Sequence, residues 1–303
     1  MRRRWWGGAV SGVLAVVLLA GCGVPAGTDG DLTDDWKALP TARQFAPQAG
    51  VCHPSADKVG YLSAYNPTDC ARTHKAETLY VGELPAEYAN RPSPPAVDSV
   101  ALRGLFPECD TRAQQFVGAD WRGARLTVQV VLPSPGGWAG GSRWYRCDIF
   151  ALGAIDGVSA RKHREDHPVD HTGSLRGALS QPSPLAHGCF DENEWSALVP
   201  KPCGQAHHFE YVGIWTTPLN DLAEVDRDPG RNHRSCRSVI ARYVGVPDDG
   251  MIRYRTGTAY RTPSEEAWAR GDRGIRCFLY LGSRVLNRSL KGGGVTALPI
   301  QTA

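Results

Sequence analysis

The sequence lacks a surplus of charge beyond its first residues. Three of its 34 lysines and arginines, Arg2, Arg3 and Arg4, lie in the first four positions, and no acidic residue precedes Asp29. Without these arginines the chain has 31 basic and 31 acidic residues, so its formal net charge of +3 belongs to the N-terminus. Because phosphate binding needs an excess of lysine and arginine, we expect no nucleic-acid partner.

The sequence also lacks the motifs of several enzyme classes. It contains no Gly-x-Ser-x-Gly elbow, no His-Glu-x2-His and no phosphate-binding loop. Ser55 and Lys58 match the Ser-x2-Lys pattern of penicillin-recognising enzymes, but Pro54 and the polar neighbours predict no buried helix there. We therefore expect a protein without catalytic residues, which is not an enzyme.

Long apolar runs are absent except for a short one at the N-terminus. Residues 7–19 are free of charge, and at 13 residues they are shorter than the roughly 20 that span a bilayer. They follow the three arginines and end in Leu-Ala-Gly-Cys, with Cys22 last. This pattern is typical of an export signal and resembles the bacterial lipobox. We interpret residues 1–21 as a lipoprotein signal peptide; an ordinary secretory signal with a chance cysteine is the alternative.

The lipobox interpretation makes Cys22 the diacylated N-terminus of the exported protein. Two or more acyl chains give stable anchoring, since each buried methylene contributes about 0.8 kcal/mol. Residues 22–50 are rich in Gly, Pro, Ala, Thr and Asp and predict a flexible tether. We therefore expect a folded body held on the extracytoplasmic face of the cell membrane by its lipid.

The other eight cysteines form two sets of four with matching neighbourhoods. Cys70 and Cys203 each begin the pattern Cys-x3-His-x2-Glu, which leads in both cases to Tyr-Val-Gly. Trp138 and Trp268 each begin the pattern Trp-Ala-x-Gly-x-Arg-x2-Arg-Cys. So many matching residue types in one order indicate a tandem duplication.

We expect each copy, at residues 51–181 and 187–300, to be a small α+β domain. Apolar residues at helical spacing predict one main helix in each, at residues 98–117 and 232–243. The Pro/Gly-rich stretch 132–141 predicts the turn of a hairpin. Each copy should thus place one helix against an antiparallel sheet. Runs of aromatic and aliphatic residues predict strands at 74–84, 125–132, 143–152, 207–215 and 274–281.

The exported cysteines enter an oxidising compartment, where paired cysteines form disulfides. Four cysteines per copy allow three pairings, and the sequence does not choose among them. We favour first with second and third with fourth, because Cys109 and Cys236 lie on the predicted helices and would join them to the following strands. The favoured pairs are Cys52–Cys70, Cys109–Cys147, Cys189–Cys203 and Cys236–Cys277.

The repeated pairs His74/Glu77 and His207/Glu210 have two interpretations. With a cysteine they supply three zinc ligands, which would suit a zinc-dependent envelope enzyme. Residues three apart on a strand point to opposite faces, however, so we favour structural roles and expect neither a metal nor another cofactor. The alternatives are a histidine bonded to the backbone and a carboxylate paired with a repeated arginine.

The repeated arginines alternate with apolar residues around a predicted strand in each copy. Internal ion pairs with Glu77 and Glu210 and the binding of an external anion are both compatible with this pattern. The residues concerned are Arg143, Arg146, Arg273 and Arg276.

Residues 156–172 of the first copy have no counterpart in the second and contain His163, His167 and His171. Their spacing of four would suit a transition metal on one helical face, but Pro168 breaks such a helix. We therefore expect a solvated loop.

Several tryptophans raise the alternative of a peptidoglycan-binding module, since tryptophan stacks on sugar rings. Trp138 and Trp268 occupy equivalent positions, so we favour roles in the core or at a turn. The other candidates are Trp144, Trp195 and Trp215.

The order of these motifs resembles the septum-formation domain of actinobacterial envelope proteins. It runs from a first cysteine through Cys-x3-His-x2-Glu and Val-Gly to a helix cysteine and a terminal Arg-x2-Arg-Cys, over Cys52 to Cys277 in two copies. The resemblance implies a membrane-attached or exported protein associated with division septa, and it supplies no catalytic residue.

Together these features predict a non-enzymatic, lipid-anchored envelope protein that acts as a binding or scaffolding factor in septum formation. Its expected partners are the membrane, through the lipid on Cys22, and a cell-wall component or a protein of the division machinery.

Overall fold

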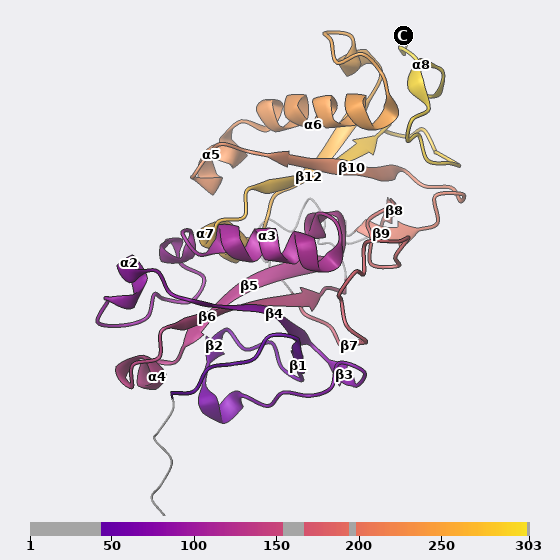
Figure 1. The fold of residues 1–303 in the computed structure, drawn as a ribbon. Helices are drawn as coiled ribbons and strands as arrows, with labels where there is room; N and C mark the ends of the chain where they lie inside the picture. The colour runs from indigo at the N-terminus through magenta and orange to yellow at the C-terminus, as the bar shows by residue number, and fades with distance from the viewer. Residues whose placement is uncertain (1–43, 154–166, 194–197, 302–303) are drawn as a thin grey trace, which may run out of the picture. The chain divides into compact units, whose positions relative to one another are not determined.

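Strands from the two halves of the chain build two five-stranded sheets (Figure 1). The computed structural model describes residues 44–153, 167–193 and 198–301. The expected signal peptide, Cys22, most of the tether, His163 and Trp195 lie outside these ranges. None of the helices within them has the length and apolar character that crossing a bilayer requires.

The N-terminal sheet has the strand order β1-β4-β6-β5-β2, and a separate two-stranded sheet pairs β3 with β7. The elements of this part are β1 (Val51–His53), β2 (Val59–Gly60), η1 (Leu62–Ala64), β3 (Thr73–His74), β4 (Ala76–Glu83), α2 (Ala86–Ala89), η2 (Val100–Leu102), α3 (Phe106–Val117), η3 (Trp121–Gly123), β5 (Leu126–Pro133), α4 (Pro135–Ala139), β6 (Trp144–Ala151) and β7 (His171–Thr172).

The C-terminal sheet has the order β11-β12-β10-β8-β9 and is antiparallel throughout. Its part of the chain contains β8 (Cys189–Glu192), β9 (Leu198–Lys201), β10 (Phe209–Thr216), α5 (Leu222–Arg227), α6 (Pro229–Val244), η4 (Ile252–Tyr254), β11 (Gly257–Arg261), α7 (Glu265–Arg270), β12 (Gly274–Tyr280) and α8 (Gly294–Ala297).

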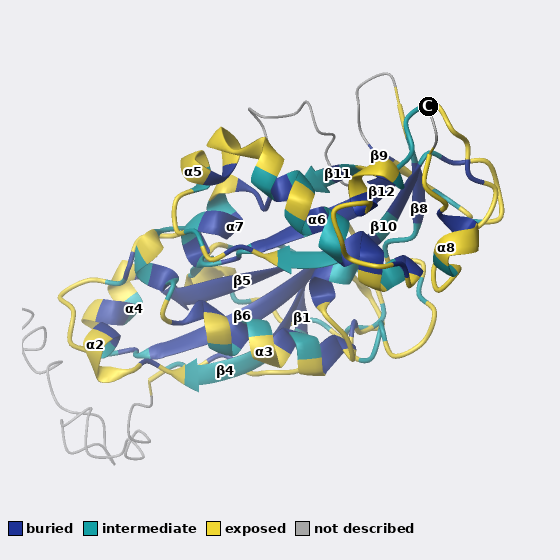
Figure 2. Cartoon of the chain, turned by 90° about the horizontal axis from the view of Figure 1, so that it is seen from above, coloured by how far each residue is buried: buried dark blue, intermediate teal, exposed yellow. Residues whose placement is uncertain are grey.

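One amphipathic helix covers a face of each sheet. α3 packs on β4, β5 and β6, and α6 packs on β10, β11 and β12, each with its buried residues toward the strands and an exposed outer face (Figure 2). Gly118 and Gly245 end the two helices in the left-handed conformation, with φ of 88° and 83°. Glycine adopts this conformation without the strain that a Cβ would cause, which fixes both ends.

The central strand pairs of the two sheets, β4–β6 and β10–β12, have closely similar registers. Glu77 lies opposite Ile149 and Glu210 opposite Leu279, and a bulge follows two positions later in both pairs. Residues of β6 alternate between the face covered by α3 and the opposite face, which carries Arg146. Phe45 and Tyr65 cover part of that opposite face.

The mixed α+β class and the central strands agree with the prediction, but three details differ. The predicted helix from residue 98 begins at Phe106, with Pro107 in its first turn, where a missing N–H costs no hydrogen bond. The hairpin turn after β5 contains the short helix α4, capped by Ser134. The N-terminal sheet is also not purely antiparallel, because β2 pairs with β5 in parallel.

Buried ion pairs join the two parts of the chain within one compact unit that begins at Gln44. The guanidinium of Arg122 contacts both Asp272 and Asp110 at 2.7 Å. Burial lowers the pKa of Arg122, but these two carboxylates outweigh it and raise the pKa overall. Arg276 also donates to the backbone carbonyl of Arg122 at 3.1 Å.

Candidate functional site

The expected disulfides are present in the structure. They pair Cys52 with Cys70, Cys109 with Cys147, Cys189 with Cys203, and Cys236 with Cys277. The second and fourth bonds join α3 to β6 and α6 to β12. The cysteines of the repeated Cys-x3-His-x2-Glu pattern are therefore disulfide sulfurs.

These bonds argue against the zinc interpretation of the repeated motif. Cys52, Cys70 and Glu77 do lie together, with their candidate ligand atoms within 4.8 Å of one another. A zinc site uses cysteine as the thiolate, however, and both sulfurs are bonded to each other. The carboxylate of Glu77 is likewise engaged elsewhere.

The two repeated glutamates are buried anchors for the segments that follow each sheet. Glu77 accepts hydrogen bonds from Ser174 Oγ at 2.6 Å and from the backbone N–H of Leu175 at 2.8 Å. Glu210 accepts from Ser289 Oγ and, at 2.9 Å, from the N–H of Leu290. The Ser-Leu sequences at residues 174–175 and 289–290 thus fasten the chain to the sheets. Tyr243 also donates to Glu210 at 2.7 Å.

The two repeated histidines are bonded to the backbone. Nδ1 of His74 lies 2.8 Å from the carbonyl of Arg72, and Nδ1 of His207 lies 2.7 Å from the carbonyl of Gln205. Since a carbonyl only accepts, Nδ1 of each ring donates this hydrogen bond. Both Nε2 atoms are buried without a hydrogen-bond partner among the described residues. This local geometry fixes both rings.

The repeated tryptophans anchor turns in the core. Trp138 is 2% exposed and Trp268 4% exposed, and their indole N–H groups donate to the carbonyls of Arg91 and Asn220. The guanidiniums of Arg143 and Arg273 stack on these rings at 4.4 and 4.2 Å and donate to the carbonyls of the same tryptophans. A guanidinium thus covers one face of each ring, and most of both side chains is buried.

Of the two interpretations of the repeated arginines, ion pairs with Glu77 or Glu210 are not formed among the described residues. Arg146 instead pairs with Asp148 at 2.9 Å. Arg276 donates to a backbone carbonyl. These pairs do not form because arginine and glutamate lie on opposite faces of each sheet, with the glutamates turned toward the serine-containing segments.

A buried polar chain beside Arg146 belongs to the N-terminal sheet alone. His53 Nε2 lies 3.0 Å from Thr78 Oγ1, and Thr78 donates to Asp148 at 2.7 Å. The corresponding positions of the C-terminal sheet hold Phe190, Tyr211 and Phe278, to judge from the strand registers.

Burial dominates the electrostatics of this chain. It lowers the pKa of His53 to about 4, with a smaller contribution from the charge of Arg146. It raises the pKa of Asp148, although Arg146 and Thr78 act in the opposite direction. Our sequence reasoning missed this network. A comparison of the residues that follow the matched cysteines would have shown it, since His53 and Asp148 each come directly after one.

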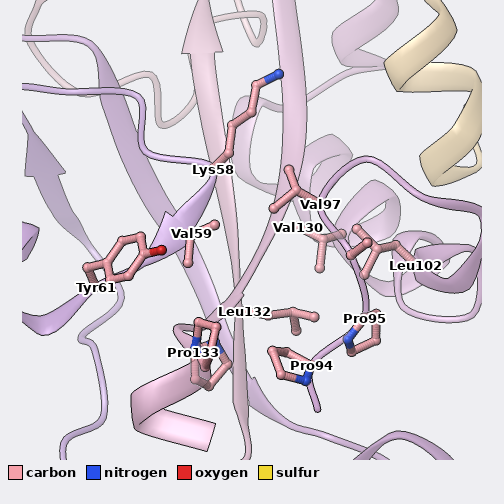
Figure 3. Close-up of a pocket in the computed structure, with 12 residues that line it drawn as sticks. Lys58, Val59, Tyr61, Pro94, Pro95, Val97, Leu102, Val130, Leu132 and Pro133 are labelled. Carbon is pink, nitrogen blue, oxygen red and sulfur yellow. The ribbon is translucent and has the colours of Figure 1, made fainter.

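An apolar pocket of about 200 Å³ opens between the β2–β5 pair and the loop after α2 (Figure 3). We call it the apolar pocket. Tyr61 and Val97, at its rim, are 49% and 38% exposed, although both are large and apolar. Exposed apolar groups around a hollow are typical of binding sites. The pocket is lined by Lys58, Val59, Tyr61, Pro94, Pro95, Ala96, Val97, Leu102, Val130, Leu132, Pro133 and Pro135.

Charged residues fix the loop that forms one wall of the apolar pocket. Asp98 has a φ of 49°, and its carboxylate contacts Lys58 at 3.0 Å and Arg270 at 2.5 Å. Lys58 in turn contacts Glu266 at 2.8 Å. Burial raises the pKa of Asp98, but Arg270 and Lys58 outweigh it and lower the pKa. A non-glycine residue in this strained conformation persists only where its surroundings hold it, as these ion pairs do.

Little in the sequence indicates this pocket. Its walls come from three separate segments, and only the prolines at positions 92, 94 and 95 are typical of a rigid loop.

The remaining candidate residues from the sequence do not converge on the apolar pocket. His171 lies beside His74 on β7, with ring centroids 5.7 Å apart, and Trp144 is buried, donating to the carbonyl of Phe45 at 3.1 Å.

The family model described as "Septum formation" matches residues 49–277. No curated protein and no solved structure matches the chain.

Proposed function

The chain belongs to the septum formation family, and from that premise we propose that it is a non-enzymatic, lipid-anchored envelope protein that binds or scaffolds a partner during septum formation. The family match over residues 49–277 is the observation that carries the septal part of this proposal. The partner we propose is a cell-wall component or a protein of the division machinery.

The four disulfides indicate an extracytoplasmic location, because such bonds persist in oxidising compartments. The proposed lipid anchor adds a position at the membrane surface and is supported by the Leu-Ala-Gly-Cys sequence that ends at Cys22. The tether after Cys22 would let the folded body reach partners near that surface.

We further propose that the chain arose by tandem duplication. Equivalent disulfides, matched strand registers around Glu77 and Glu210, and matched Ser-Leu contacts to both carboxylates support this origin. The polar chain of His53 would then be a later divergence of the first copy.

The binding part of the proposal is supported by the apolar pocket and by the ion pairs of Asp98, which hold one wall of this pocket in place. The residues repeated in both halves are engaged in disulfides, backbone hydrogen bonds and stacking. These structural roles account for their repetition, so a catalytic role is not needed to explain it. The exposed apolar rim has no such internal explanation, and a partner that covers it would supply one.

Imaging of a fluorescent fusion that folds after export tests the proposed function directly. We expect wild-type protein to collect at division septa, a Cys22→Ala variant to lose its attachment to the membrane, and deletion to disturb septum formation. Uniform distribution together with normal septa on deletion would overturn the septal role.

A further inference from the structure

We propose that the apolar pocket and the acidic hollow beside it form one groove, which binds a peptide segment of a protein partner with an aromatic side chain and a nearby Lys or Arg. This inference rests on the proposed binding function and states the chemistry of the partner. The acidic hollow, of about 370 Å³, is lined by residues that include Val100, Arg103, Asp221, Asp226, Glu265 and Trp268.

The two hollows lie on either side of one short stretch of chain. Val97 lines the apolar pocket and Val100 the acidic hollow, and the two side chains are 38% and 61% exposed. They are three positions apart in the sequence, so their Cα atoms are at most about 11 Å apart. Three or four residues of an extended peptide cover this distance.

The size and lining of the apolar pocket favour an aromatic side chain. An apolar cavity of about 150 Å³ in another protein holds benzene, so a pocket of about 200 Å³ holds an aromatic ring. Four prolines and several aliphatic side chains surround the space, and the ammonium of Lys58 points away from it (Figure 3). Prolines and the ion pairs of Asp98 keep the wall ordered before binding, which reduces the entropy cost of association.

The charged residues around the groove determine whether the peptide side chain next to the aromatic one should be basic or acidic. At the mouth of the apolar pocket, Lys58, Asp98, Glu266 and Arg270 neutralise one another in ion pairs. In the acidic hollow, Arg103 donates to the backbone carbonyls of two other residues instead of to a carboxylate.

Three carboxylates, Asp221, Asp226 and Glu265, line the acidic hollow with the single guanidinium of Arg103, so the balance of its lining charges is negative. Asp226 and Glu265 are exposed and form no ion pair among the described residues. Asp221 caps α5 and has a distant contact with Arg227 at 3.7 Å. A Lys or Arg side chain complements this hollow, whereas an acidic one is repelled.

Selection from a phage-displayed library of random heptapeptides, with the exported and oxidised protein as bait, tests the inference. We expect enriched peptides to carry an aromatic residue two to four positions from a Lys or Arg. Enrichment of acidic residues at that spacing, or no enrichment, would overturn the proposed partner chemistry.

Charge-swapped variants distinguish the loss of a specific contact from the loss of folding. For a synthetic version of the most enriched peptide, the double variant Asp226→Lys/Glu265→Lys should weaken binding at least tenfold at low salt. Replacing the basic residue of that peptide by Glu should restore affinity for this variant. Val97→Glu should abolish binding, and Val295→Glu, at an exposed apolar site on α8, should leave it unchanged.

Equal binding of both charge forms by wild-type and swapped protein would contradict the inference. The inference would also be contradicted if the wild-type protein bound cell-wall glycan or lipid vesicles instead of peptides, and if Val97→Glu abolished that binding. If no peptide is selected while the fusion still collects at septa, the partner chemistry fails and the proposed function stands. If peptides are selected but the fusion spreads uniformly, the septal role fails and the groove stands.

Discussion

A histidine in the core of one sheet and a phenylalanine at the equivalent place in the other give a residue-level test of the structure. His53 is 2% exposed and has a pKa of about 4, well below the usual 6.5, because burial disfavours its charged form. At pH 7 it is neutral in both folded and unfolded chains. As the pH falls below 6.5 the unfolded chain binds a proton that the folded chain refuses, so stability decreases until the pH nears 4.

We expect His53 to lower the free energy of unfolding by about 2 kcal/mol between pH 7 and pH 5. His53→Gln keeps a donor for Thr78 but does not titrate, so its loss over this range should be smaller by that amount. Urea denaturation at both pH values measures the difference. Asp148, whose raised pKa acts in the opposite direction, is present in both proteins. Equal losses in the two proteins would show that His53 is charged or exposed in the fold.

At the same scale, the sequence identified the structurally important residues, but it did not identify the residues that they contact. Glu77 and Glu210 were identified by repetition, yet their serine partners lie 97 and 79 residues away along the chain. No local pattern joins such pairs. The sequence left ion pairs with arginine open as an alternative for the same reason, since facing residues on a sheet depend on pairing that the sequence does not reveal.

The ends of the two main helices allow a matched test at the scale of the element. Gly118 and Gly245 have nearly the same left-handed φ, but a Cβ at Gly245 would meet nothing within 4 Å, whereas one at Gly118 would overlap Ser180. Gly245→Ala should cost about 1–2 kcal/mol of unfolding free energy, from backbone strain alone. Gly118→Ala should cost more, because the strain and the overlap add.

Thermal or denaturant unfolding of both variants measures this difference, with Gly250→Ala as the control. Gly250 is exposed, has no positive φ and has open space around it, so alanine there should change stability by less than about 0.5 kcal/mol. Equal costs at Gly118 and Gly245 would contradict the packing of Ser180 against the end of α3.

Elements with strong local signals were predictable. Cysteine and apolar residues at helical spacing located α3 and α6, and β-branched runs located the central strands. The short strands β1, β2, β8 and β9 escaped prediction, since two to four residues carry no periodicity. α7 begins with capping by Ser264, a signal that was present in the sequence but overlooked.

At the scale of the whole molecule, Arg122 joins the two parts of the chain. Its partner Asp272 is buried, so Arg122→Met would leave a carboxylate without its cation. Removing one member of a buried pair costs about 3–5 kcal/mol. We expect the denaturation midpoint of Arg122→Met to fall accordingly, while Arg112→Met, which breaks the exposed pair with Glu108, leaves it nearly unchanged. Similar midpoints for the two variants would show that the buried contact between Arg122 and Asp272 is absent in solution.

The apolar pocket also belongs to this scale, which explains why the sequence did not reveal it. Its walls come from residues 58–61, 94–102 and 130–135, and each segment is ordinary in composition. Only the fold brings them together, and ion pairs with Lys58 and with Arg270 of α7, from the other half, hold Asp98 in place.

The central claim is that this protein acts at septa by binding through the apolar pocket, and the position of a pocket variant in dividing cells tests it most directly. Fluorescent fusions of wild type, Val97→Glu and the control Val295→Glu should be compared in cells that lack the native protein, at matched amounts of each fusion. We predict septal enrichment of wild type and of Val295→Glu, and an even distribution of Val97→Glu along the envelope. Septal enrichment of Val97→Glu equal to that of wild type would contradict the account.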